Sequence, residues 1–305
     1  LITLHGNEMQ GFLKGDFNIH VLPEVFKLFL HQYYPSYISA PEEKIPDENF
    51  SFAFNFGNVD PFLRALTKNF YGLNNASVQG GINTHNDTLQ LAASIPDFGY
   101  GRYHFTNIDL NGYGTLTRLS VQSTIQGIYI RDSLWFPDTH LSLNSSHDTS
   151  FVSLRTSVPK ALASTDLYGR IITIKNGYLV NILHSAILIN DKEWEITPGN
   201  EITISNNNVR VKDFNMSQNQ QHITLTSIPN DTAHFSFLLD VKNLILSDFL
   251  RLMPASNTRA EGLVSGTIHL SDLLGNAQVQ TNLSAEEFRL NKDSLGIGRA
   301  SCRER

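Results

Sequence analysis

The stretch Asn49-Phe50-Ser51-Phe52-Ala53-Phe54-Asn55-Phe56 decides the fold. Its four phenylalanines alternate with small or polar residues. Successive side chains of a β-strand point to opposite faces of a sheet, so this segment predicts a strand with one aromatic face and one polar face. Phenylalanine is itself favoured on pleated surfaces.

The same two-residue alternation recurs along the chain. Apolar pairs flank a single polar residue in five further segments: Leu89 and Leu91 around Gln90, Leu141 and Leu143 around Ser142, Ile202 and Ile204 around Thr203, Val209 and Val211 around Arg210, and Ile223 and Leu225 around Thr224. Each of these segments predicts a strand with one apolar face.

Turn-forming dipeptides separate the strands. Glycine and asparagine tolerate the positive φ angles of tight hairpins, so we expect turns at Gly80-Gly81, Asn86-Asp87, Asn111-Gly112, Asn176-Gly177, Asn190-Asp191 and Asn206-Asn207-Asn208. The expected fold is mainly β: a long antiparallel meander bent into a U-shaped, solenoid-like groove with a few short helices. We expect residues 1–296 to form one continuous, repeat-built segment.

Three segments have helical spacing instead. They lie near residues 22–34, 60–70 and 245–253, and the second has Asp60 and Pro61 in its first turn. The segments beginning at Asp60 and Asp248 resemble each other, and each leads into a predicted strand. This likeness indicates a weak internal repeat, although chance similarity between two amphipathic turns is the alternative.

Composition excludes several classes of protein. The formal net charge is −6, without a run of Lys or Arg, so nucleic acid is not an expected partner. Residues Ile297–Arg305 resemble the translation of a common sequencing adapter, and we expect them not to belong to the fold. The single cysteine, Cys302, lies in this segment, so neither a disulfide nor a thiolate metal site is expected.

Catalytic chemistry is not expected either. Ser145-Ser146-His147-Asp148 has triad residue types, but it lies between two strands and is predicted to be a hairpin turn. No metal-ligand spacing and no phosphate loop occurs, so we expect no enzyme, no metal and no cofactor. Trp135 and Trp194 have the residue type that stacks on carbohydrate, but a tryptophan at the edge of an apolar face is the more common case.

The apolar face requires a cover. Four phenylalanines carry roughly 600–1,000 Å² of apolar area at about 150–250 Å² each, whereas the largest exposed apolar patch of a monomer is usually ~300–600 Å². A second sheet or lipid chains could provide the cover. If lipid chains do, we expect these residues to line the groove: Phe50, Phe52, Phe54, Phe56, Leu89, Leu91, Leu141, Leu143, Ile202, Ile204, Val209, Val211, Ile223 and Leu225.

Several segments in order resemble the TamB family of translocation and assembly proteins, within the AsmA-like group, in its Bacteroidota-type members. They are Tyr33-Tyr34-Pro35-Ser36-Tyr37, the Phe50–Phe56 strand, 59–66, 188–196 (LINDKEWEI), 198–204 (PGNEITI), 241–252, Gly262-Leu263-Val264-Ser265-Gly266 and Asp272-Leu273-Leu274-Gly275.

The resemblance implies a periplasmic protein, anchored to the inner membrane through a region outside residues 1–305, that moves phospholipid between the two membranes along an apolar groove. It also implies a link to outer-membrane protein assembly and protein secretion, with a TamA-like barrel as partner. One alternative is a scaffold whose sheet edges pair with strands of outer-membrane β-barrel proteins. A less favoured alternative is a glycan-binding β-solenoid.

Overall fold

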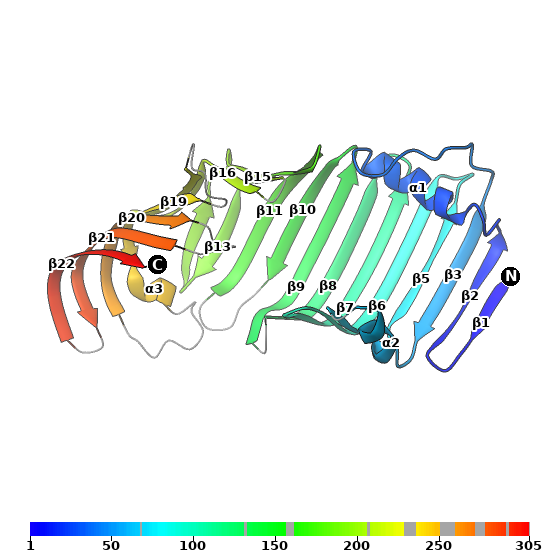
Figure 1. The fold of residues 1–305 in the computed structure, drawn as a ribbon, viewed down its shortest axis with the longest axis horizontal. Helices are drawn as coiled ribbons and strands as arrows, with labels where there is room; N and C mark the ends of the chain where they lie inside the picture. The colour runs from blue at the N-terminus through cyan, green and yellow to red at the C-terminus, as the bar shows by residue number, and fades with distance from the viewer. Residues whose placement is uncertain are drawn as a thin grey trace. The chain divides into compact units, whose positions relative to one another are not determined.

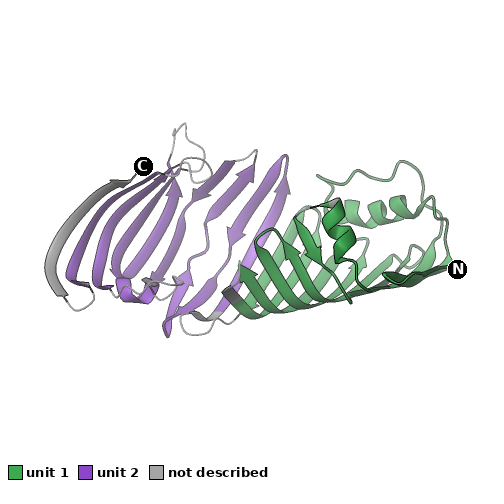
Figure 2. Cartoon of the chain, turned by 60° about the horizontal axis from the view of Figure 1, so that its bottom comes forward, with its two compact units in different colours: residues 1–157 green, residues 158–305 purple. Residues whose placement is uncertain are grey.

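A computed structural model describes residues 1–305 except Lys68, 131–132, 157–161, 206–207, 229–235, 251–259, 272–277, 291–292 and Arg305. The chain forms two compact units, residues 1–157 and residues 158–305 (Figure 2). Both are built of antiparallel strands, with short helices among the described residues. The predicted mainly-β antiparallel fold is therefore confirmed. None of the described helices has the length and apolarity needed to span a membrane.

Unit 1 is one open antiparallel sheet whose strands lie side by side (Figure 1). Its strands, in spatial order and apart from β4, are β1 Ile2–His5, β2 Met9–Asp16, β3 Asn49–Phe56, β5 Ser77–Asn83, β6 Thr88–Tyr100, β7 Tyr103–Thr115, β8 Leu119–Ile130, β9 Ser133–Ser146 and β10 Thr149–Thr156. The short strand β4, Phe70–Gly72, pairs with the far end of β6.

Helix α1, Leu22–Tyr33, lies across one end of these strands (Figure 1). Pro23 in the first turn needs no amide partner there, and Glu24 forms a 2.6 Å ion pair with Lys27 one turn later. Val25, Phe29 and Tyr33 recur at helical spacing and are fully buried. The apolar stripe therefore fixes which face of α1 meets the sheet.

Helix α2, Asp60–Leu66, ends before Phe70, so the predicted helix over residues 60–70 is too long. The Asp60 carboxylate accepts a 2.6 Å hydrogen bond from Arg64 Nε and another of 2.6 Å from the Gly72 amide. Pairing with Arg64, followed by the Gly72 hydrogen bond, lowers the pKa of Asp60. This aspartate fastens the helix start to β4.

Unit 2 contains the strands β11 Leu162–Ile174, β12 Gly177–Ile182, β13 Ser185–Ile189, β14 Lys192–Ile196, β15 Glu201–Ser205, β16 Asn208–Lys212, β17 Phe214–Gln218, β18 Gln221–Ser227, β19 Phe237–Ile245, β20 Ala260–Ser271, β21 Gln278–Leu290 and β22 Asp293–Glu304. Strand β11 pairs with β12 through one half and with β13 through the other. One branch continues to β15 and β16, and the other continues to β14 and β17.

The predicted helix over residues 245–253 corresponds to α3, Leu246–Leu250, and 251–259 lie outside the described residues. Strand β22 includes most of 297–305, and whether that segment belongs to the natural chain stays a prediction.

Four predicted turns agree with the structure. Asp87, Asn176, Asn190 and Asp191 have positive φ angles at hairpin tips, and His147 and Asp148 form the tip between β9 and β10. Two predicted turns are wrong: Gly80-Gly81 lies inside β5, and Asn111-Gly112 lies inside β7. Residues 206–207 of the remaining predicted turn lie outside the described residues.

Candidate functional site

The sheet of unit 1 has one apolar face, and strand register places its residues in cross-strand rows. Row 1 contains Gly15, Phe50, Ile82, Leu89, Gly114, Leu119, Ser145 and Ser150. Row 2 contains Leu13, Phe52, Gly80, Leu91, Gly112, Val121, Leu143 and Val152. Row 3 contains Gly11, Phe54, Val78, Ala93, Leu110, Ser123, Leu141 and Leu154. Row 4 includes Met9, Phe56, Ile95, Ile108, Ile125 and Thr139. None of these rows contains a charged residue.

The opposite face is polar. The row between rows 2 and 3 contains Phe12, Ala53, Gln79, Ala92, Asn111, Gln122, Ser142 and Ser153, and the next row contains Gln10, Asn55, Ser77, Ser94, Asp109, Thr124, His140 and Arg155. Register thus places mainly polar residues on this face, although Phe12, Tyr113 and Phe151 also occupy positions on it.

Helix α1 covers row 1. Phe50 is only 4% exposed, and its ring contacts Phe17 at 6.0 Å and Phe26 at 6.5 Å between centroids. Tyr33 donates a 2.7 Å hydrogen bond to the Thr115 carbonyl, and burial raises the pKa of Tyr33 to about 12. A Cβ on Gly114 would lie 2.4 Å from the Tyr33 hydroxyl, so only glycine permits this approach. The described buried core of unit 1 is this helix–sheet contact.

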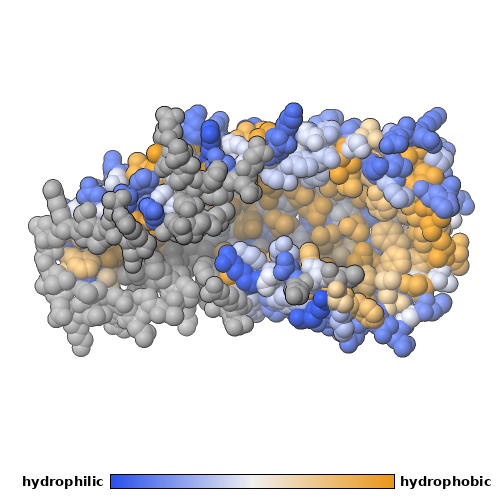
Figure 3. Space-filling view, viewed as in Figure 1, coloured by the Kyte–Doolittle hydropathy of each residue, from blue (hydrophilic) through white to orange (hydrophobic). Residues whose placement is uncertain are grey.

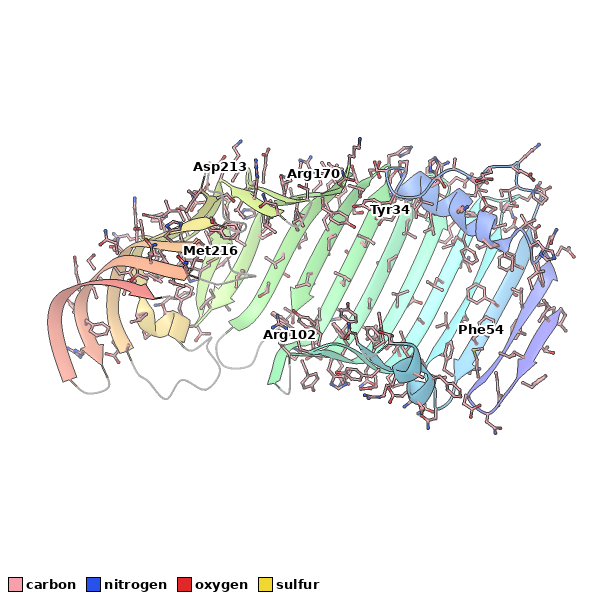
Figure 4. All side chains as sticks on the ribbon, viewed as in Figure 1. Tyr34, Phe54, Arg102, Arg170, Asp213 and Met216 are labelled. Carbon is pink, nitrogen blue, oxygen red and sulfur yellow. The ribbon has the colours of Figure 1, made fainter. Side chains whose placement is uncertain are left out.

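The chain after α1 is fastened to the β9–β10 hairpin (Figure 4 labels Tyr34). The Tyr34 hydroxyl shares hydrogen bonds with Ser145 Oγ at 2.8 Å and Ser150 Oγ at 3.3 Å. The Ser36 hydroxyl donates to Asp148 at 2.8 Å, and the Asp148 amide donates to the Tyr33 carbonyl at 2.8 Å. The tyrosine-rich motif therefore holds α1 across the sheet from β3 to β10.

Most residues of rows 2 to 4 are only partly buried, although Ser123 and Thr139 are 7% and 1% exposed. Phe52, Phe54 and Phe56 all retain exposed surface, unlike Phe50. Figure 3 shows a hollow in unit 1 lined by hydrophobic residues, and Figure 4 shows Phe54 on this face of the sheet, away from α1. We call rows 2 to 4 the apolar groove of unit 1. Its width is about three rows at ~7 Å per row.

Unit 2 has an apolar face of the same kind. One row contains Ser185, Ile196, Met216, Ile223, Val241, Gly266 and Leu283, and the next contains Phe214, Leu225, Leu239, Ile268 and Thr281. The alternate positions carry polar residues, such as Glu195, Ser217, His222 and Lys242. In the other branch, Ile202 pairs with Val211 and Ile204 pairs with Val209, so these four share one face.

Helix α3 packs on the β13–β14 hairpin of unit 2. Trp194 is fully buried and contacts Phe249 edge-to-face, with 5.2 Å between ring centroids. Asp248, 1% exposed, accepts 2.6 Å hydrogen bonds from Lys192 Nζ and Asn190 Nδ2. Residues 188–196 thus form the surface on which α3 packs. Because Trp194 is buried, it cannot stack on a sugar, and the side chain of Trp135 lies outside the described residues.

The predicted lining residues are distributed as follows. Phe50 lies beneath α1, and Leu89 packs against the same core. Phe52, Phe54, Phe56, Leu91, Leu141 and Leu143 lie in the groove of unit 1. Ile202, Ile204, Val209, Val211, Ile223 and Leu225 lie on apolar strand faces of unit 2. Sequence reasoning missed Val121, Val152, Leu110 and Ile108 in unit 1, although two-residue alternation around Asp109 could have found the last two.

The polar clusters of the described residues are small. Ser146 Oγ lies 2.7 Å from His147 Nδ1, but Ser146 also donates to the Thr117 carbonyl at 2.7 Å, so this serine is held within the hairpin. His104 pairs with Asp97 between the rings of Tyr71 and Tyr129. No group of three or more His, Cys, Asp or Glu residues forms a metal site in the described part of the chain.

The chain matches no protein-family model, no curated protein and no solved structure. The class it belongs to is therefore defined by its own geometry: an open antiparallel β-sheet with one apolar face, partly covered by short helices. The resemblance to the TamB family rests on the quoted sequence segments alone.

Proposed function

We propose that the protein holds phospholipid acyl chains in its apolar groove and belongs to a bridge that carries phospholipid between an inner and an outer membrane. The observation that carries this proposal is the charge-free set of rows 2 to 4 in unit 1, of which only Leu13 and Phe52 in row 2 pack against the core beneath α1.

The physical argument is one of transfer from water. Apolar surface left in contact with water costs about 25 cal/mol per Å². Acyl chains would remove that cost without a specific polar partner, and a trough lacking polar anchors would allow them to slide. Partly exposed Phe54, Leu91 and Leu143 provide such a surface.

Location and partners follow from the family resemblance and form part of the proposal. The bridge would lie in the periplasm, with membrane attachment and a TamA-like outer-membrane partner supplied by regions beyond residues 1–305. A contribution to outer-membrane protein assembly belongs to the same proposal.

Site-specific photocrosslinking tests the groove. A benzoylphenylalanine at position 54 replaces a groove residue of β3, and the matched control at position 55 projects from the polar face of the same strand. We expect phospholipid crosslinks from position 54 in cells and few from position 55.

The same experiment separates the competing function. Crosslinks to outer-membrane β-barrel proteins from both positions, without lipid crosslinks from position 54, would contradict lipid carriage. They would instead favour a scaffold that pairs with strands of those proteins. A further control at position 50, beneath α1, should give little lipid because Phe50 is 4% exposed.

A further inference from the structure

The polar face of unit 1 contains a hollow of about 610 Å³ that runs across six strands, from Phe12 on β2 to Gln122 on β8. Most of its lining residues occupy polar-face positions by register, so it lies on the side opposite the apolar groove; the row 2 residues Phe52, Gly80, Leu91 and Gly112 also border it. Its volume is within the ~300–1,000 Å³ typical of small-molecule sites.

Small side chains make the floor of this hollow. Ser51, Ala53, Ala92 and Ser120 line it on β3, β6 and β8, where longer residues would fill the space. Phe12 and Tyr113 are 38% and 48% exposed and lie four strand-to-strand steps apart, a separation of about 19 Å at ~4.8 Å per step.

Each of four neighbouring strands contributes one amide to the hollow: Gln79 on β5, Gln90 on β6, Asn111 on β7 and Gln122 on β8. These side chains are exposed, and none makes a hydrogen bond or ion pair within the structure described here. Each amide offers two N–H donors and a carbonyl acceptor. The hollow has no Asp, Glu, Lys or Arg in its lining.

We propose that this hollow binds an extended, neutral, β-linked glycan that crosses the strands. Amides match paired sugar hydroxyls because they donate and accept in one plane, and exposed aromatic rings stack on the apolar faces of pyranoses. The absence of charge in the lining favours a neutral chain over an anionic one.

The spacing between neighbouring strands also fits a glycan. Neighbouring strands are ~4.8 Å apart, close to the advance of one sugar in an extended β-linked chain. A glycan lying across the strands would therefore meet Gln79, Asn111 and Gln122 in one cross-strand row, with Gln90 two residues further along β6 beside Tyr113. This site is independent of the lipid groove and does not depend on its function.

Calorimetric titration of the 305-residue protein tests the proposal. The probes are the β-1,4-linked hexasaccharides of glucose and of N-acetylglucosamine, which distinguish a plain from an acetamido sugar. We expect one of them to bind at one site. The double variant Gln79→Ala/Gln122→Ala should weaken binding about tenfold, which corresponds to ~1.4 kcal/mol, because it removes hydrogen bonds to the sugar hydroxyls.

Two control variants accompany this test. Gln10→Ala removes an exposed amide from the same face outside the hollow and should leave affinity unchanged. Tyr113→Ala should weaken binding, whereas Tyr113→Phe should retain it. Failure of both hexasaccharides to bind at millimolar concentration would overturn the proposal, as would equal affinity of the double variant and Gln10→Ala. If the wild type self-associates but binds no glycan, and the double variant no longer self-associates, the proposal is overturned. The hollow would then be an interface between two copies of the chain.

Discussion

Tyr33 is the residue whose ionisation should be visible in the stability of the whole unit. Burial raises its pKa from 10.0 to about 12, and its hydroxyl donates to the Thr115 carbonyl. Between these two pH values the unfolded chain loses the phenol proton while the folded chain keeps it. The free energy of unfolding should therefore be unaffected by this group below pH 10 and fall as pH rises toward 12.

The variant Tyr33→Phe isolates that effect. It should lower stability by ~0.5–1.5 kcal/mol near neutral pH through the lost hydrogen bond, but reduce the loss between pH 10 and pH 12. Urea unfolding at a series of pH values measures both. Tyr113→Phe, at an exposed tyrosine, is the control. An unchanged pH profile in Tyr33→Phe would mean that another group causes the alkaline loss.

The buried ion pair of Asp248 leads to a second prediction for a single residue. Its carboxylate is 1% exposed between Lys192 and Asn190, and removing it would leave a partly buried ammonium group without a partner. Because Lys192 retains 32% exposure, we expect Asp248→Ala to cost ~2–3 kcal/mol, below the full value for a wholly buried pair. Tryptophan fluorescence during urea unfolding gives the measurement. Glu193→Ala, on an exposed side chain of β14, should cost almost nothing, and equal losses would exclude the ion pair as the cause.

At the scale of elements, β3 offers a matched comparison. Phe50 lies beneath α1, whereas Phe54, four residues along the same strand, faces the open groove. Phe50→Ala should cost ~3–5 kcal/mol because it leaves a cavity under the helix. Phe54→Ala should cost much less, because little packing is lost. Similar losses for the two variants in urea unfolding would mean that Phe54 belongs to a closed core.

The β-strands and their faces were predictable from sequence because two-residue alternation reports directly on burial. Asn190-Asp191 and Asn176-Gly177 were also predictable, since hairpin tips require positive φ. A turn was wrongly predicted at Gly80, because the glycine is required by a contact with a neighbouring strand and not by a turn. A Cβ on Gly80 would lie 2.7 Å from Phe52 Cζ, so the residue makes room for a ring on the neighbouring strand. Sequence alone does not say which strand lies beside which glycine.

The placement of the helices was less predictable than their existence. Periodicity indicates that α1 has an apolar stripe, but the residues that fasten it, Ser145, Asp148 and Ser150, lie more than 100 positions along the chain. The same separation hid the role of Asp248, whose partners Lys192 and Asn190 lie on another hairpin. Long-range polar contacts of this kind leave no local pattern.

At the scale of the whole molecule, each unit combines a one-sided apolar sheet with a short helix that covers only part of it. In unit 1, α1 covers row 1, and in unit 2, α3 covers the surface around Trp194. A sheet needing only a folded core would place helices over the entire apolar face, since any uncovered area costs free energy. The partial cover is the observation on which the proposed lipid-holding function rests.

That reasoning gives the last prediction. The double variant Leu91→Asp/Leu143→Asp puts two carboxylates into row 2 of the groove, where acyl chains would have to bury them. The matched control Gln90→Asp/Ser142→Asp adds the same charge at the adjacent positions on the polar face. Native mass spectrometry of protein purified from cells should detect bound phospholipid in the wild type and the control, and little in the groove variant, because an unpaired buried carboxylate is strongly disfavoured. Circular dichroism of all three proteins separates loss of lipid from loss of fold. Equal phospholipid in both variants would show that lipid binds outside row 2, and wild-type protein free of lipid would contradict the proposed carriage.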